Sequence, residues 1–167
     1  MTKAKRKTCF VIMPYGEKKE SEDKPPIDFD EIFEFIIKPP LNSLDIEVIR
    51  CDKIPNAGSI HHEMLHHILN DDIAIVDITT LNPNVFYELG VRHTLRRSGT
   101  ILIRKKGTQS PFNIQGMRTI EYDTSLSGAN SAIEKLKKSV EVALSSSASD
   151  SLVYDVFPSL KMILPNE

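Results

Sequence analysis

The residue in this sequence most suited to chemistry is Glu88, the single acid of a mostly apolar stretch. It follows Asn82-Pro83, a pair typical of a helix start because asparagine caps free N–H groups and proline fits the first helical position. Before this pair, residues 73–78 form an apolar, β-branched run that predicts a buried strand ending near Asp77. Glu88 is therefore expected in the crevice beyond the carboxyl ends of the strands, where open α/β sheets bind ligands.

Burial in such a crevice would raise the pKa of the Glu88 carboxyl and make it a usable nucleophile or general acid/base. A second interpretation is structural. Arg92 follows four residues later, a spacing at which an ion pair on an exposed helix stabilises it by about 0.2–0.5 kcal/mol. The helix, expected over residues 83–95, is apolar around most of its circumference and should be largely enclosed.

Two more polar residues are predicted near the same edge of the fold. Asp52 ends a strand expected over residues 46–51, where an acid either binds a ribose hydroxyl or forms a turn. Ser59 is a candidate cap for a helix expected over residues 59–70, and the start of that helix could hold a phosphate. No Walker or G-x-G-x-x-G pattern indicates a nucleoside triphosphate or dinucleotide of the usual kind.

Residues 62–66 (HEMLH) match the H-E-x-x-H string of zinc proteases. At 100° per residue the apolar side chains of this helix share one face, and His62 and His66 lie on the other, facing solvent. A third ligand has no obvious candidate, so we predict no metal site. His61 falls on the apolar side and is expected to be packed and hydrogen-bonded.

Five strand-like runs alternate with helical patterns along the chain. They cover residues 8–14, 46–51, 73–78, 99–104 and 118–122. This alternation predicts the α/β class, a flavodoxin-like or Rossmann-like three-layer sandwich with a five-stranded parallel sheet of order 2-1-3-4-5. In that order the third strand, with Asp77, is central and lies beside the first strand. The end of the first strand and the turn after it contain Met13, Pro14, Tyr15 and Gly16.

The segments between the strands are less regular. Residues 17–26 are charged and end in two prolines, which predicts a mobile loop, either a lid over the site or a surface loop without a role. A helix is expected from Asp28 to its end at Pro39-Pro40. The last amphipathic helix is bounded by the serine run at 145–147.

Length and composition fit one ordinary globular domain. The 167 residues are 40% hydrophobic and 26% charged, enough for one core. We expect a flexible basic arm at 1–7, a single α/β domain at 8–145, and a tail at 146–167. The tail is too apolar to stay in water and is expected to pack on the domain, on another copy or on a partner.

Charge and hydropathy exclude several function classes. A net charge of −2 creates no field for nucleic acid or an anionic membrane, so a small ligand or a protein partner is expected. No apolar run approaches the ~20 residues that cross a bilayer, and the basic start leads into no signal-peptide core, which favours the cytoplasm. Cys9 and Cys51 lie in strand-like runs and are expected to be buried reduced thiols, a disulfide between them being the alternative.

Three of these stretches resemble a known superfamily. They are residues 10–16 (FVIMPYG), residues 50–52 (RCD), and residues 77–79 (DIT) with residues 82–90 (NPNVFYELG). Together they resemble the nucleoside 2-deoxyribosyltransferase-like superfamily, near which lie the bacterial Toll/interleukin-receptor-like nucleotidases. The resemblance spans residues 8–104 and is most specific around Glu88.

In the deoxyribosyltransferases the glutamate of the E-L-G box attacks the anomeric carbon and forms a glycosyl-enzyme ester, which related hydrolases pass to water. By resemblance Glu88 is the nucleophile, and Asp77 assists the leaving base or binds sugar hydroxyls. Gly90 is expected to allow close packing near the site. The resemblance also implies a homo-oligomer. One position departs from the family, because the acid six residues before the nucleophile is here Asn82, a neutral amide that cannot protonate a leaving base.

The resulting hypothesis is an N-glycosidase, a hydrolase or a deoxyribosyltransferase-like enzyme, that acts on a nucleoside, nucleotide or NAD-like molecule without a cofactor. Its catalytic candidates are Glu88 and Asp77. Its ligand-binding candidates are Met13, Pro14, Tyr15, Gly16, Asp52, Ser59, Asn82 and Asn84. The rival hypothesis is a non-catalytic nucleotide-sensing or Toll/interleukin-receptor-like signalling module that keeps the pocket and signals through its apolar tail.

Overall fold

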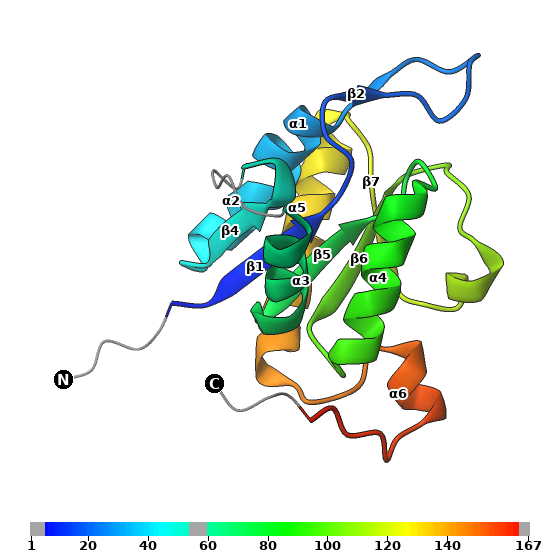
Figure 1. Ribbon diagram of the computed structural model, residues 1–167. Coiled ribbons are helices and arrows are strands. Elements are labelled where there is room, and N and C mark those ends of the chain that lie inside the picture. The colour runs from blue at the N-terminus through cyan, green and yellow to red at the C-terminus, as the bar shows by residue number, and fades with distance from the viewer. Residues whose placement is uncertain (1–5, 54–59, 164–167) are drawn as a thin grey trace.

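A five-stranded, wholly parallel sheet forms the centre of the computed structural model, which describes residues 6–53 and 60–163 (Figure 1). The strands are β1 (Thr8–Ile12), β4 (Glu47–Arg50), β5 (Ile73–Asp77), β6 (Thr100–Lys105) and β7 (Thr119–Tyr122). Their spatial order is β4-β1-β5-β6-β7, which is 2-1-3-4-5 when these strands are numbered along the chain. The predicted fold class is confirmed, and β5 with Asp77 at its end is the central strand.

Helices cover both faces of the sheet because alternate strand residues point to opposite sides. On one face Phe10 and Ile12 pack with α3 (Ile60–Asn70) and α4 (Pro83–Leu95). On the other face, Cys9 and Val11 pack in a cluster with the remaining sheet-covering helices. These helices are α1 (Phe29–Ile32), α2 (Lys38–Ser43) and α5 (Leu126–Ser145). Each face therefore has its own apolar core.

The prediction that Pro39 and Pro40 end their helix is wrong. The chain passes from α1 through a π-helical turn, Phe33–Ile37, and continues as α2 across both prolines. The Lys38 N–H donates to the carbonyl of Phe33, five residues back. Because the prolines lie in the first turn after this wider turn, their missing N–H groups interrupt the hydrogen-bond ladder where it is already offset.

Residues 17–26, predicted as a mobile loop, begin with a two-residue strand and form the arm of a small antiparallel hairpin. Strand β2 (Glu17–Lys18) pairs with β3 (Ile27–Asp28), and the arm projects above the sheet (Figure 1). Gly16, with φ of 64°, makes the turn into it, and its carbonyl accepts the N–H of Phe29 at 3.1 Å. The hairpin is thus fixed at its base to the start of α1.

The tail packs on the domain for part of its length. Helix α6 (Leu152–Val156) contacts α4, with the Ser151 hydroxyl donating to the His93 carbonyl at 2.6 Å and Tyr154 buried. Beyond it Phe157 is 61% exposed and Ile163 is 90% exposed, so the expected burial of the tail is only partial. Across the described residues, no helix combines the length and apolarity that a membrane span requires.

Candidate active site

Helix α4 places Glu88 at the carboxyl edge of the sheet. The helix begins as predicted, because Pro83 occupies its first turn and the Asn82 side chain accepts the N–H of Asn84 at 2.9 Å. Val85 and Leu89 are buried against the sheet. Glu88, adjacent to Leu89 on the helix, is half-buried, so its carboxylate is partly withdrawn from water.

The Glu88 carboxylate makes no hydrogen bond or ion pair with any residue in the described part of the chain. Burial alone raises its pKa to about 7. A neutral carboxyl and a carboxylate are therefore both present near neutral pH. An acid in this state can serve as a nucleophile when ionised or as a proton donor when neutral.

The structural interpretation of Glu88, an ion pair with Arg92, is wrong. Arg92 is fully buried and turns away into the protein. Its guanidinium donates to four backbone carbonyls, at distances between 2.7 and 3.3 Å: those of Ile68, Asp71, Asp72 and Gly99. The arginine joins the end of α3 to the residues just before β5 and β6, and its guanidinium therefore gives Glu88 no counter-charge.

The end of β4 lies near Glu88. Burial raises the pKa of the half-buried Cys51 thiol, and the carboxylates of Glu88, Asp52 and Glu63 raise it further. These charges act on the thiol only because they are close to it. The end of β4, helix α3 and helix α4 thus bring these groups close together. Both cysteines are free thiols, as expected, although Cys51 is only partly buried.

Asp52 is held by an arginine that precedes it. The buried Arg50 guanidinium donates from Nε and Nη2 to the two carboxylate oxygens of Asp52, at 2.5 and 2.7 Å. Its Nη2 also donates to Asp30 at 2.6 Å, and its guanidinium carbon lies 4.6 Å from the ring centre of Phe33. Asp52 therefore has a fixed position in the short 3₁₀ turn Cys51–Lys53, and Arg50 ties the end of β4 to α1.

Asp77 lies in a closed network rather than at an open surface. It is 1% exposed, and it accepts the Thr79 N–H at 2.9 Å, the Thr79 hydroxyl at 2.5 Å and the Tyr122 hydroxyl at 2.7 Å. Burial raises the pKa of Asp77 to about 6, against the effect of these hydrogen bonds. Thr79 also accepts the Lys105 N–H at 2.9 Å, so the network joins the ends of β5, β6 and β7.

The hairpin reaches the same edge of the sheet. Burial and Asp77 are the main causes of a raised pKa at Tyr122, and the carboxylate of Glu20 in the hairpin arm adds to them. Within the turn before the arm, Met13 and Pro14 are buried, whereas Tyr15 is 57% exposed. The Gly16 N–H donates to Asp30 at 3.3 Å, which places the turn beside the Arg50 pair.

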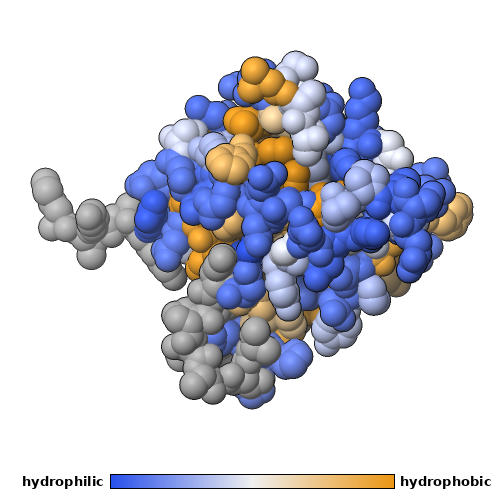
Figure 2. All heavy atoms as spheres, turned by 90° about the horizontal axis from the view of Figure 1, so that it is seen from above, coloured by the Kyte–Doolittle hydropathy of each residue, from blue (hydrophilic) through white to orange (hydrophobic). Residues whose placement is uncertain are grey.

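Seen from above, over the carboxyl ends of the strands, the surface is mostly hydrophilic, with small groups of hydrophobic atoms between polar side chains (Figure 2). Asn84, in the first turn of α4, is exposed. Ser59, predicted as a cap and phosphate ligand, lies outside the described residues.

The histidines of α3 do not converge. His62 and His66 are exposed, and the described residues contain no group of three or more side chains placed to hold a metal ion. His61 is also exposed, so the prediction that it packs on the apolar side is wrong. The packed histidine is His67, which stacks on Phe10 at 5.3 Å between ring centres and bonds Asp71.

Comparison with models of protein families and with curated proteins finds no match to this chain. The site must therefore be interpreted from its own geometry.

Two residues of this edge were not predicted to act there. Tyr122 ends the fifth predicted strand, and the carboxyl ends of parallel strands share one edge, so its approach to Asp77 was in principle foreseeable. For Arg50 the sequence carries half of the signal, because Asp52 follows two residues later, whereas the second partner, Asp30, is distant in the chain. Gly90 is corrected as well, since its α-carbon faces open space rather than a close packing partner.

Proposed function

We propose that the protein is an N-glycosidase that cleaves the bond between base and sugar in a nucleoside, a nucleotide or an NAD-like molecule, with Glu88 as the nucleophile. The observation that carries the proposal is a half-buried carboxylate at the carboxyl edge of a parallel sheet, with a pKa raised to about 7 and no partner among the described residues.

In the proposed reaction the ionised Glu88 attacks the anomeric carbon of the sugar. The C–N bond breaks, its electron pair leaves with the base, and a glycosyl ester forms on Glu88. Water then attacks the same carbon, loses a proton and releases the sugar from Glu88. A deoxyribosyltransferase-like enzyme would use a second base in place of water.

The leaving group decides which substrate the site favours. The Asn82 amide occupies the position of the family's acid and accepts the Asn84 N–H as a helix cap, so it does not supply a proton. The nicotinamide of NAD carries a positive charge when bound and departs as a neutral molecule. It needs no proton, and for this reason we favour an NAD-like substrate over a neutral nucleoside.

The remaining residues of the edge would hold the substrate. Asp52, fixed by Arg50, and the exposed Asn84 would bind ribose hydroxyls, and the turn from Met13 to Gly16 would contact base or phosphate. Asp77 would act as a positioning residue, because its oxygens are engaged by Thr79 and Tyr122. We further propose that the enzyme works in the cytoplasm and forms a homo-oligomer. Gel filtration of the purified protein tests the oligomeric state, and elution as a monomer alone would contradict it.

The deciding experiment incubates the purified protein with deoxynucleosides, nucleoside monophosphates and NAD, and measures released base by chromatography. Glu88→Gln should release no base, since an amide of the same shape cannot attack carbon. Glu134→Gln is the matched control, because Glu134 is exposed on α5. Base release that persists in Glu88→Gln would refute the assignment of the nucleophile.

A second function is favoured by two observations, one of which is again Asn82. Asn82 occupies the position at which the transferases carry an acid, and in the tail Phe157 and Ile163 are exposed. A non-catalytic sensing module would bind a nucleotide without turnover and would interact through this tail. It is distinguished by a ligand that raises the melting temperature of the wild-type protein without base release, together with a partner or self-association that is lost when the tail is removed.

A further inference from the structure

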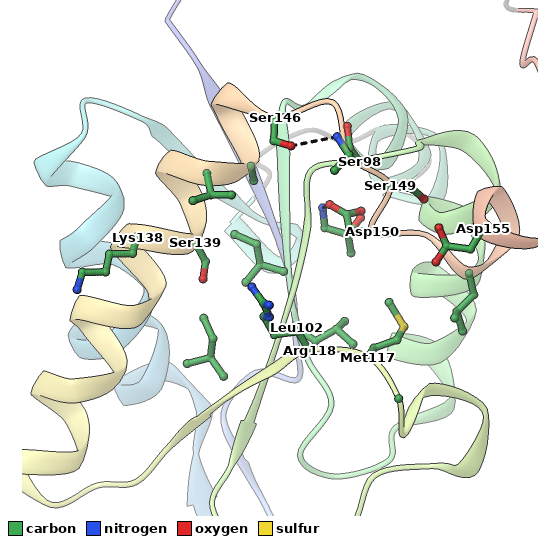
Figure 3. Close-up of a pocket in the computed structure, with 18 residues that line it drawn as sticks. Ser98, Leu102, Met117, Arg118, Lys138, Ser139, Ser146, Ser149, Asp150 and Asp155 are labelled. Carbon is green, nitrogen blue, oxygen red and sulfur yellow. Dashed lines mark hydrogen bonds between the residues drawn. The ribbon is translucent and has the colours of Figure 1, made fainter. Parts of the chain in front are cut away.

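A cavity of about 650 Å³ lies at the amino-terminal ends of β6 and β7, at the opposite edge of the sheet from Glu88 (Figure 3). Its floor is made by Thr100, Leu102 and Ile120 of the two strands. One wall is α5, and the other is the segment that leads from α5 into α6. Its volume is within the range of sites that bind small molecules in proteins.

The second wall is held in place by hydrogen bonds. Asp150, between α5 and α6, accepts the N–H groups of Gly99 at 2.7 Å and of Thr100 at 3.0 Å. Its own N–H donates to the Arg97 carbonyl at 3.1 Å, and the next residue, Ser151, is bonded to α4. The cavity is therefore formed before any ligand arrives, which lowers the entropic cost of binding.

Two cationic residues lie at one end of the cavity, although the Lys138 ammonium is directed away from the other labelled residues in Figure 3. Arg118, from the approach to β7, and Lys138, from α5, both line it, and neither has an ion pair or hydrogen bond within the described part of the chain. A second hollow of about 420 Å³ shares Arg118 and Lys138 and adds Lys135. The acid of that hollow, Glu121, is bonded to Arg104 at 2.8 Å, so it is already neutralised.

The rest of the lining combines apolar side chains, several hydroxyls and the carboxylates of Asp150 and Asp155. Leu102, Met117 and Val142 supply apolar surface. Figure 3 shows Leu102 and the Ser139 hydroxyl on the same side of the cavity as Arg118, and Ser139 makes no hydrogen bond among the described residues. Asp155 on α6 occupies the opposite side. A negative group is thus attracted to one end and repelled from the other, which gives a bound molecule a single orientation.

We propose that this cavity is a second ligand site, separate from Glu88, which binds a small amphipathic organic anion. Its phosphate or carboxylate contacts Arg118, Ser139 and the flexible Lys138 side chain, and its apolar body lies over Leu102 and Val142. The chemistry that recognises the ligand is a charge-assisted hydrogen bond at one end and apolar contact along the rest.

The test titrates 1-naphthyl phosphate into the full chain and follows binding by calorimetry, with inorganic phosphate and 1-naphthol as fragments. One molecule of 1-naphthyl phosphate should bind per chain, at least tenfold more tightly than either fragment, because each fragment satisfies only one part of the cavity. Equal affinity for 1-naphthol would overturn the role of the cations. Equal affinity for inorganic phosphate would overturn the role of the apolar wall.

Three variants locate the binding. Arg118→Gln combined with Lys138→Gln should weaken binding by about tenfold or more, since the charged contacts are lost. Val142→Trp should do the same by filling the mouth, and because Val142 is 61% exposed the larger side chain does not enter the core. The control, Lys19→Gln combined with Lys106→Gln, removes two positive charges outside the cavity lining and should leave the affinity for 1-naphthyl phosphate unchanged.

Glu88→Gln separates this site from the proposed active site. Unchanged binding of 1-naphthyl phosphate in Glu88→Gln supports a distinct cavity, whether or not the enzyme cleaves any nucleotide. Binding that is lost in Glu88→Gln, or that survives both the Arg118/Lys138 and the Val142 variants, would overturn the proposal.

Discussion

Replacing Glu88 by glutamine tests the desolvation that makes this carboxyl a candidate nucleophile. Burial raises the pKa of Glu88 from an ordinary 4.5 to about 7. Each pKa unit corresponds to about 1.4 kcal/mol, so without solvent screening this shift would change the free energy of unfolding by about 3 kcal/mol between low and high pH. Because the side chain is still partly wetted, we expect about 1–2 kcal/mol after solvent screening.

The sign follows from proton binding. Between pH 4.5 and about 7 the folded protein holds a proton on Glu88 that the unfolded chain has lost, so stability falls as the pH rises through this window. Glutamine mimics the protonated form and does not titrate. Glu88→Gln should therefore match the wild type at pH 4.5 and be more stable than it at pH 8.5.

Urea unfolding of both proteins at pH 4.5, 6, 7 and 8.5 measures this difference. Asp77 titrates in both proteins, so its contribution cancels. Glu134→Gln, an exposed change on α5, controls for the loss of one charge and should show a flat difference. A Glu88→Gln protein whose stability difference from wild type is the same at pH 4.5 and pH 8.5 would refute the reasoning that Glu88 is desolvated.

The remaining predictions concern the frame around the site and are measured by the same unfolding assay. Arg92→Met should cost about 3–5 kcal/mol, because it removes the donor from four backbone carbonyls and leaves the buried carbonyls of Ile68 and Asp71 without the guanidinium; a cost below about 1 kcal/mol would contradict the role of the guanidinium. Tyr122→Phe should cost about 1–3 kcal/mol of stability because Asp77 loses a hydrogen-bond donor. The cost should be larger at pH 8 than at pH 5, since Asp77 has a pKa of about 6 and its ionised form needs the donor more; an equal cost at both pH values would argue against the hydrogen bond. Gly90→Ala should stabilise α4 by about 0.5–1 kcal/mol, as nothing lies near the added carbon. Gly99→Ala should instead cost more than about 2 kcal/mol, because Gly99 has φ of 91° and an added carbon would clash with the Asp72 carbonyl; a neutral effect would show that the turn can shift.

Local signals in the sequence were enough for the sheet and for α4. The alternation of apolar runs with helical patterns fixes a parallel sheet, and Asn82-Pro83 fixes the first residue of the helix because capping depends only on adjacent residues. The same information gave the position of Glu88 relative to the strand ends. These features depend on residues close together in the chain, which a pattern can report.

Features that depend on distant partners were not predicted. The spacing of Glu88 and Arg92 allows an ion pair, but it does not reveal the unpaired carbonyls that draw Arg92 inward. The hairpin has only two residues in each strand, too few for an alternating pattern. The cavity at the other edge depends on the path of the tail from α5 to α6, which Asp150 sets through contacts with Gly99 and Thr100.

The position of β1 in the sheet has a consequence for synthesis of the chain. Cys9 of this first strand pairs with Val48 on one side and with Ile73 on the other. During translation the apolar run of β1 emerges long before either neighbour exists, so it has no native partner until β4 and β5 have left the ribosome. A growing chain of this kind exposes a strand edge to other chains, and its folding is slow because its contacts are distant in sequence.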